Sequence, residues 1–160
     1  MSAVSPVLLK TILELQHLPS LSQFFLAGGT NLALRYDHRE SIDIDLFCNT
    51  IIGYKGFEKI KLEVETFYKE KARNFIDPVN LNDQFTFLRF FIFKKGITIK
   101  VDLIQNMKSM DEPEISDGVR LFSAKDIGLF KLMSASSRPA KKDIYDLDYI
   151  TDEIQLINLF

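Results

Sequence analysis

The spacing of apolar residues divides the chain into helical and extended segments. Residues 7–18 carry apolar side chains at helical spacing and stop at Pro19, which predicts an amphipathic helix. Residues 24–27 form a short apolar run that ends at a glycine pair, a pattern typical of a buried strand entering a tight turn. The sequence favours a helix over residues 30–36, and residues 57–71 predict a second amphipathic helix.

Residues 41–47 alternate strictly between polar and apolar side chains. In an extended strand this alternation places Asp43 and Asp45 on one face and the apolar residues, beginning with Ile42, on the other. We therefore predict a strand whose two carboxylates point the same way.

A hairpin is predicted further along the chain. The Phe-rich segment at residues 84–93 is followed by Lys-Lys-Gly at 94–96, which is typical of a hairpin turn, and then by an extended segment at 97–105. We expect the two segments to pair as antiparallel strands. In the second strand, Lys100 and Asp102 would share one face.

Four phenylalanines alternate along the first strand of this hairpin: Phe85, Phe87, Phe91 and Phe93. This spacing suggests a platform on which nucleic-acid bases could stack. The intervening side chains, such as Leu88 and Phe90, are also apolar, which favours a core strand covered on both faces.

Two further helices are predicted near the end of the chain. Ser123 can cap a helix over residues 124–136, and a last helix spans 141–150. No internal repeat or long linker interrupts the pattern. We expect one domain, residues 1–160, of the α/β (α+β) class, with a mixed or antiparallel sheet flanked by helices.

Composition and charge narrow the function. The 160 residues carry a net charge of -2, so no global positive field attracts nucleic acid or anionic membrane, and any such contact requires a local basic patch. No apolar run approaches the roughly 20 residues that span a bilayer, and the N-terminus lacks the pattern of a signal peptide. We therefore expect a cytoplasmic protein without a membrane partner.

The acidic residues suggest metal chemistry. Magnesium prefers hard oxygen ligands and keeps part of its coordination shell for phosphate oxygens, so two carboxylates on one rigid strand, Asp43 and Asp45, suit it. Transfer to a hydroxyl also needs a third carboxylate that deprotonates the nucleophile and shares a second metal. Asp102 is the candidate for that role.

The glycine pair suggests phosphate binding. Gly28 and Gly29 let backbone N–H groups approach a polyphosphate, and the helix that begins near Thr30 directs its positive end toward the same anion. A glycine pair or an Asp-x-Asp pair alone is more often structural than functional. Their combination in one short segment favours a site.

These residues carry a family resemblance. Gly28-Gly29-Thr30, then Asp43-Ile44-Asp45, then Asp102 resemble the pattern of the polymerase-beta-like nucleotidyltransferase superfamily. Three longer segments are similar to the AbiEii/AbiGii toxin family of nucleotidyltransferases: LAGGTNLALRY, SIDIDLF and KDIGLFKLMSASSRPAKKDIYDLDYI. The resemblance covers about residues 24–150, which we interpret as the catalytic core, and it implies a polymerase-beta-like nucleotidyltransferase fold.

The resemblance implies roles for individual residues. The implied metal ligands, for Mg²⁺ or Mn²⁺, are Asp43, Asp45 and Asp102. The implied contacts to the NTP phosphates are Gly28, Gly29, Thr30 and Lys131. Asp143 and Asp146 match the last motif; Asp143 is the better candidate for a site role and Asp146 for a structural brace. Lys131 also lies between apolar neighbours and could simply extend along an apolar surface.

Several basic residues admit two interpretations. Arg35 and Arg39 flank the site helix and could meet phosphate or base, but such arginines are more often solvated partners of nearby acids. Arg138, Lys141 and Lys142 could guide RNA as point charges, or they could form a solvated helix start.

The resemblance also implies an activity. We expect transfer of a nucleoside monophosphate from an NTP to a hydroxyl acceptor, by resemblance RNA such as a tRNA 3′ end, in a toxin-antitoxin or phage-defence system with a cognate antitoxin. A small-molecule nucleotidyltransferase of the aminoglycoside type and an inactive nucleotide-binding relative are the alternatives. Family members usually carry a larger C-terminal helical region, so we expect this chain to hold the metal and the nucleotide but to offer little surface for a large acceptor.

Overall fold

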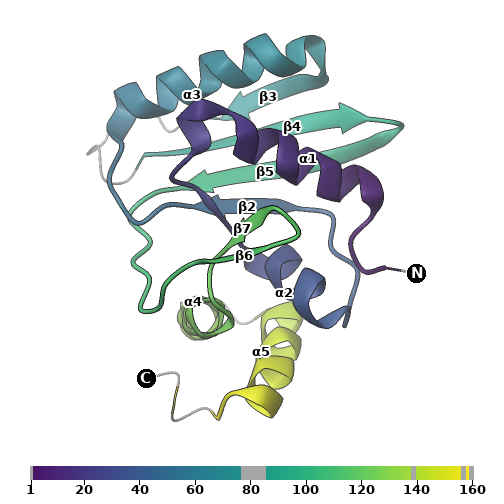
Figure 1. The fold of residues 1–160 in the computed structure, drawn as a ribbon, viewed down its shortest axis with the longest axis vertical. Coiled ribbons are helices and arrows are strands. Elements are labelled where there is room, and N and C mark those ends of the chain that lie inside the picture. Colours follow the sequence, from purple (N-terminus) through teal and green to yellow (C-terminus); the bar gives the residue numbers. More distant parts are fainter. Residues whose placement is uncertain (1, 77–85, 138–139, 156–157, 159–160) are drawn as a thin grey trace.

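The computed structural model describes residues 2–76, 86–137, 140–155 and 158. Within them a seven-stranded mixed sheet has the strand order β3-β4-β5-β2-β1-β7-β6 (Figure 1). The strands are β1 (Phe25–Ala27), β2 (Ile44–Phe47), β3 (Ala72–Ile76), β4 (Phe87–Lys94), β5 (Ile97–Ile104), β6 (Glu114–Ser116) and β7 (Val119–Leu121). Strand β2 runs parallel to β5 and β1 runs parallel to β7, whereas the other neighbouring strands are antiparallel. The expected mixed sheet is therefore confirmed, and the two strands that carry the acids are neighbours in it.

Helices cover the sheet unevenly. They are α1 (Pro6–His17), α2 (Gly28–Tyr36), α3 (Gly53–Tyr68), α4 (Ala124–Ser137) and α5 (Lys141–Glu153), with 3-10 turns at Pro19–Leu21 and Lys69–Lys71. Figure 1 shows α1 and α3 lying across the sheet near β3, β4 and β5, while α2, α4 and α5 gather at the other end of the molecule. In the described residues no helix is long and apolar enough to cross a membrane.

Two hydrophobic clusters lie on opposite faces of the sheet. The larger one joins α1 and α3 to the apolar face of the sheet, with Ile12, Ile60 and Phe90 at its centre. The smaller one lies under α2, α4 and α5 and contains Ala27, Leu32, Phe122, Ile127 and Ile150. This second cluster holds α4 and α5 against the end of β1, where the glycine pair begins α2.

The predicted helices are present, with shifted ends. The chain enters α1 through Ser5, whose hydroxyl accepts a hydrogen bond from the Leu8 N–H at 3.2 Å. The predicted cap Ser123 is confirmed, because its hydroxyl accepts from the Asp126 N–H at 3.1 Å. Helix α2 begins at Gly28 rather than Thr30, so the glycine pair belongs to the first helical turn.

The strand expected over residues 41–47 is shorter than its alternation suggests. Only Ile44–Phe47 form β2, because β1 pairs with it up to Ala27 opposite Asp45 and the chain then turns into α2. Ile42 lies before the strand and is 67% exposed, so the predicted strand does not extend back to it.

The Phe-rich strand β4 lies inside the sheet, between β3 and β5. Its fully buried side chains are Leu88, Phe90 and Ile92. By contrast, Phe87, Phe91 and Phe93 on the other face are only half-buried, so the expectation of a strand covered on both faces is wrong. Phe85 lies outside the described residues. The difference arises because α1 and α3 cover one face of this half of the sheet.

Candidate active site

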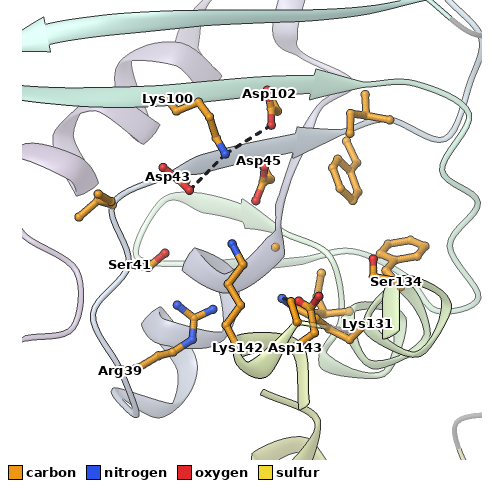
Figure 2. A pocket seen from close by; sticks show the side chains of 18 of the residues that line it. Arg39, Ser41, Asp43, Asp45, Lys100, Asp102, Lys131, Ser134, Lys142 and Asp143 are labelled. Carbon is orange, nitrogen blue, oxygen red and sulfur yellow. Dashed lines mark hydrogen bonds and ion pairs between the residues drawn. The ribbon is translucent and has the colours of Figure 1, made fainter. Parts of the chain in front are cut away.

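Two neighbouring strands bring the predicted acids together. Asp45 in β2 and Asp102 in β5 are direct partners in the parallel register, and Asp43 lies just before β2. All three line a cavity of about 670 Å³. Figure 2 shows their side chains on the same side of the sheet, facing the helical wall of the cavity. The predicted set Gly28, Gly29, Lys131 and Asp143 lines the same cavity.

The glycine pair is required by close contacts. Gly28 has a φ of +63°, and a Cβ at this position would lie 2.0 Å from Oδ2 of Asp45. A Cβ on Gly29 would lie 2.2 Å from Nη2 of Arg39. The absence of side chains at the start of α2 therefore lets a carboxylate and a guanidinium approach the helix terminus from two sides.

The electrostatics of the acid cluster favour a bound cation. Burial, together with the neighbouring charges of Asp102 and Asp43, raises the pKa of Asp45 to about 6 against the opposing effect of Lys100. A carboxylate that is costly to ionise in this position would be stabilised by a positive ion. Three carboxylates supply the hard oxygen donors that magnesium prefers.

Basic side chains of the protein itself contact these carboxylates. The Lys100 ammonium lies 3.4 Å from Oδ2 of Asp43 and 4.0 Å from Oδ2 of Asp102 (Figure 2). Arg89 donates to both oxygens of Asp102, with Nε at 2.6 Å and Nη2 at 3.0 Å. In this arrangement the described residues contain no group of three His, Cys, Asp or Glu side chains placed to hold a metal ion. The carboxylate oxygens of this cluster are suitable ligands for magnesium. In this structure Lys100 and Arg89 balance the negative charge of the carboxylates.

The role of Arg89 was missed by the sequence analysis, although a signal for it exists. Lys94 pairs with Ile97 across the turn, and the antiparallel register then places Arg89 opposite Asp102. A two-residue turn determines this register along the whole hairpin. Lys100 was placed on the face of Asp102, but its contact with Asp43 depends on β2 being the next strand.

Thr30 differs from its predicted role. Its side chain is buried and does not line the cavity, in contrast to the two glycines before it. The hydroxyl is hydrogen-bonded to Oγ of Ser41, at 2.7 Å, and to the Asp43 carbonyl. Thr30 thus joins α2 to the segment that carries Asp43 instead of presenting its hydroxyl to a nucleotide.

The helical wall of the cavity contains a second polar network. The Lys131 ammonium of α4 lies 2.6 Å from Oδ1 of Asp143 and 3.0 Å from Oδ2 of Asp146, both on α5. Asp146 also accepts from Nε and Nη2 of Arg39, each at 2.7 Å, and contacts Nε2 of His38 at 2.7 Å. Lys131 is therefore paired with carboxylates, and the expectation that Asp146 acts as a structural brace is confirmed.

The pKa of Asp146 reflects these contacts. Burial alone would raise it, but hydrogen bonds from Arg39, His38 and Lys131 outweigh burial and lower the pKa to about 2. Asp146 is thus a buried, ionised carboxylate that holds Arg39 and Lys131 beside the cavity. Both of these cations line the cavity, so they remain available to an anionic ligand.

The basic residues for which the sequence allowed either a site role or a solvated role lie in different places. Arg35 forms an ion pair with Glu114 at 2.8 Å and does not line the cavity, whereas Arg39 does. Lys142 also lines the cavity, and Figure 2 shows its ammonium directed toward the acids. Lys141 is exposed, and Arg138 lies outside the described residues.

The sequence matches a known protein family over almost its full length. The model of the nucleotidyl transferase AbiEii toxin family, described as a type IV toxin-antitoxin system, matches residues 11–158. The chain belongs to the AbiEii nucleotidyl transferase family. The matched range includes the glycine pair, the Asp-x-Asp strand and the Lys131–Asp143 pair, which are residues that carried the resemblance in the sequence.

Individual similar proteins agree with this membership. An uncharacterized protein of Aquifex aeolicus, aq_aa25, is 30% identical over 131 residues, which cover 81% of the chain but 58% of the length of that relative. The antibiotic-resistance factor ANT(2'')-Ia has a similar fold, with a TM-score of 0.54 and 14% identity over 94% of this chain and 88% of that one. The Megavirus polyadenylate synthase also matches with a TM-score of 0.54, at 12% identity, over 90% of this chain and 31% of that one. The predicted nucleotidyltransferase fold is thereby confirmed.

Proposed function

We propose that this AbiEii family member, with Mg²⁺ or Mn²⁺, transfers a nucleoside monophosphate from an NTP to a hydroxyl group of an RNA acceptor, such as a tRNA 3′ end, and releases pyrophosphate. The observation that carries the proposal is the register of two parallel strands, which places Asp45 beside Asp102 and next to Asp43. This acid cluster faces the N-terminus of α2, where two glycines expose the backbone. Phosphoryl transfer requires this combination of charge neutralisation and positioning.

Each side of the cavity has a proposed task. Asp43 and Asp45 would hold the metal, which on binding neutralises the phosphate charge and polarises the reacting phosphorus. The N-terminus of α2 at Gly28 and Gly29 would bind phosphate oxygens through its N–H groups. Lys131 would contribute a positive charge from the helical wall.

Asp102 would accept the proton of the attacking hydroxyl. Its bidentate pair with Arg89 holds the carboxylate in a defined orientation. Asp143, paired with Lys131 at 2.6 Å, would orient that lysine toward the nucleotide. The proposal places the reaction in the cytoplasm, where NTPs and tRNA occur, and the type IV toxin-antitoxin description of the family supports a cognate antitoxin as partner.

A radiolabel assay tests the proposal directly. The purified protein is incubated with magnesium and each α-labelled NTP, and with either total tRNA or an aminoglycoside as acceptor. We expect label in the RNA, and no label when Asp43→Asn replaces the wild type, because the amide removes a charged metal ligand. The matched control is Glu58→Gln, which changes an exposed carboxylate on α3 outside the cavity and should transfer normally.

The outcomes separate the candidate activities. Label in the aminoglycoside but not in the RNA would support the small-molecule alternative. NTP binding without transfer to any acceptor would support the inactive relative. Full transfer by a folded Asp43→Asn protein would contradict the assignment of Asp43 as a metal ligand. In the cell, growth arrest on induced expression of the wild type, absent for Asp43→Asn, is expected of a toxin.

A further inference from the structure

Among the described residues, no helix covers one face of β3, β4 and β5 beside the active site. The cluster beneath α2, α4 and α5 includes apolar residues of β1 and β2, but among the described residues it includes none of β3, β4 or β5. On this face Phe91 and Phe93 are half-buried, and Thr98 and Arg73 are exposed. The opposite face of the same strands is packed under α1 and α3.

The register of the strands shows that this face leads along β4 and β5 toward the acid cluster. Across β4 and β5, Phe93 pairs with Thr98, Phe91 pairs with Lys100, and Arg89 pairs with Asp102. The distance along β4 from Phe93 to the position opposite Asp102 is four residues, or roughly 13 Å. A short extended ligand lying on this face would therefore reach the cavity.

The side chains along this path are aromatic and cationic. The Arg73 guanidinium lies over the Phe93 ring at 4.7 Å from its centroid, and Arg73 pairs with Phe91 in the register of β3 and β4. Arg73 is exposed and contributes a positive charge to this face, whereas the charge of Arg89 is balanced by Asp102. Aromatic faces flanked by arginines are the chemistry that binds single-stranded nucleic acid, since bases stack on rings and phosphates pair with cations.

We propose that Arg73, Phe91 and Phe93 form a stacking platform for the single-stranded 3′ end of the RNA acceptor and direct its terminal hydroxyl toward Asp102. This inference rests on the proposed transferase function and assigns the surface that receives the acceptor. The location would give a protein of acidic net charge a local cationic and aromatic surface for RNA on the face that leads to the cavity. It also separates acceptor binding from NTP binding, because none of the three platform residues lines the cavity.

Two variants test the platform without disturbing the cavity. Arg73→Ala removes an exposed cation, and Phe93→Leu keeps an apolar side chain while removing the aromatic ring. The matched control is Lys61→Ala, because Lys61 also lies over a phenylalanine ring, that of Phe75, at 5.3 Å, but on the face covered by helices. All three substitutions remove one cation–π pair.

Binding and kinetics are measured with the full chain. Fluorescence anisotropy reports binding of a labelled single-stranded RNA oligonucleotide with a free 3′ end, and steady-state assays give KM for the acceptor and for the NTP. We expect Arg73→Ala and Phe93→Leu each to weaken oligonucleotide binding and to raise acceptor KM roughly tenfold, since base stacking on an aromatic ring has about this effect. The NTP KM should stay within about twofold of the wild type. Arg73→Ala should also reduce the slope of log binding constant against log salt concentration by about 1, because one phosphate contact is lost.

The result that overturns the platform differs from the result that overturns the proposed function. If the wild type labels RNA but both variants keep the acceptor KM of Lys61→Ala, the platform is wrong and the transferase function stands. If the wild type labels no RNA with any NTP, the RNA-directed function fails and the platform fails with it. Weaker RNA binding by both variants, at unchanged NTP KM, supports the platform.

Discussion

Replacing Asp146 by asparagine would remove the negative charge from a carboxylate that contacts three basic side chains and is fully buried. Asparagine has nearly the same shape, so the change isolates the charge. Arg39 would then face a neutral amide, whereas Lys131 would keep its second carboxylate partner, Asp143, at 2.6 Å. Breaking a buried ion pair from one side leaves an uncompensated charge, which is why such changes are strongly destabilising.

The magnitude follows from the pKa of Asp146. Its folded value of about 2 lies below the ordinary value of 3.8, and a difference of this size corresponds to about 2 kcal/mol of stability at neutral pH. The Arg39 charge that loses its carboxylate partner adds to this, so we expect Asp146→Asn to lower the free energy of unfolding by about 2–4 kcal/mol. The nearby exposed Asp148 on the same helix provides the control Asp148→Asn, for which we expect a change below about 0.5 kcal/mol.

Urea unfolding at several pH values is the assay. Because the folded pKa of Asp146 is lowered, its contribution is fully present above pH 4 and is lost as the pH falls from about 4 to about 2. The difference between the wild type and Asp146→Asn should therefore be constant from pH 7 to 5 and shrink below pH 4. A difference smaller than about 0.5 kcal/mol at pH 7, or one that does not change in acid, would refute the reasoning.

Two further predictions concern the acid cluster. Burial raises the pKa of Asp45 to about 6, so its ionisation costs stability at pH 7 and the cost disappears once the carboxyl is protonated in both states, below about pH 4. Asp45→Asn should thus raise the free energy of unfolding of the metal-free protein by up to about 3 kcal/mol at pH 7 and not at pH 4, while abolishing transfer. Urea titrations at both pH values check this, and a loss of stability at pH 7 would contradict it. Since the Lys100 ammonium lies between Asp43 and Asp102, Lys100→Met should bind Mn²⁺ roughly tenfold more tightly than the charge-matched control Lys142→Met in electron paramagnetic resonance titrations, and equal affinities would show that Lys100 does not compete with the metal.

The local patterns of the sequence were sufficient for much of the fold. Helical spacing located α1 and α3, and the Lys-Lys-Gly turn located the hairpin of β4 and β5. Strand alternation placed Asp43 and Asp45 on the same side, which the cavity lining bears out. These features depend on contacts within a few residues, so a periodic pattern of side chains is enough to specify them.

The same patterns failed where an element depends on a distant neighbour. Alternation extended the strand back to Ser41, but β2 begins only at Ile44, because β1 on its other side ends at Ala27 and the chain turns into α2. The Phe-rich strand looked covered on both faces because the sequence does not say how many helices pack on a sheet. Thr30 matched a phosphate-binding pattern, yet its hydroxyl is used by Ser41 and the Asp43 carbonyl.

The sequence by itself determined the residue types of the site, their order and the direction in which the strand acids point. Only the tertiary structure decided which charges meet. Arg39 and Asp146 are 107 residues apart in the chain, and their pairing depends on the packing of α5 against the end of α2. Likewise Lys100 reaches Asp43 only because β2 and β5 are parallel neighbours. Ion pairs act over a few ångströms in space and carry no periodicity along the chain, so they become visible only when the packed elements bring the charges together.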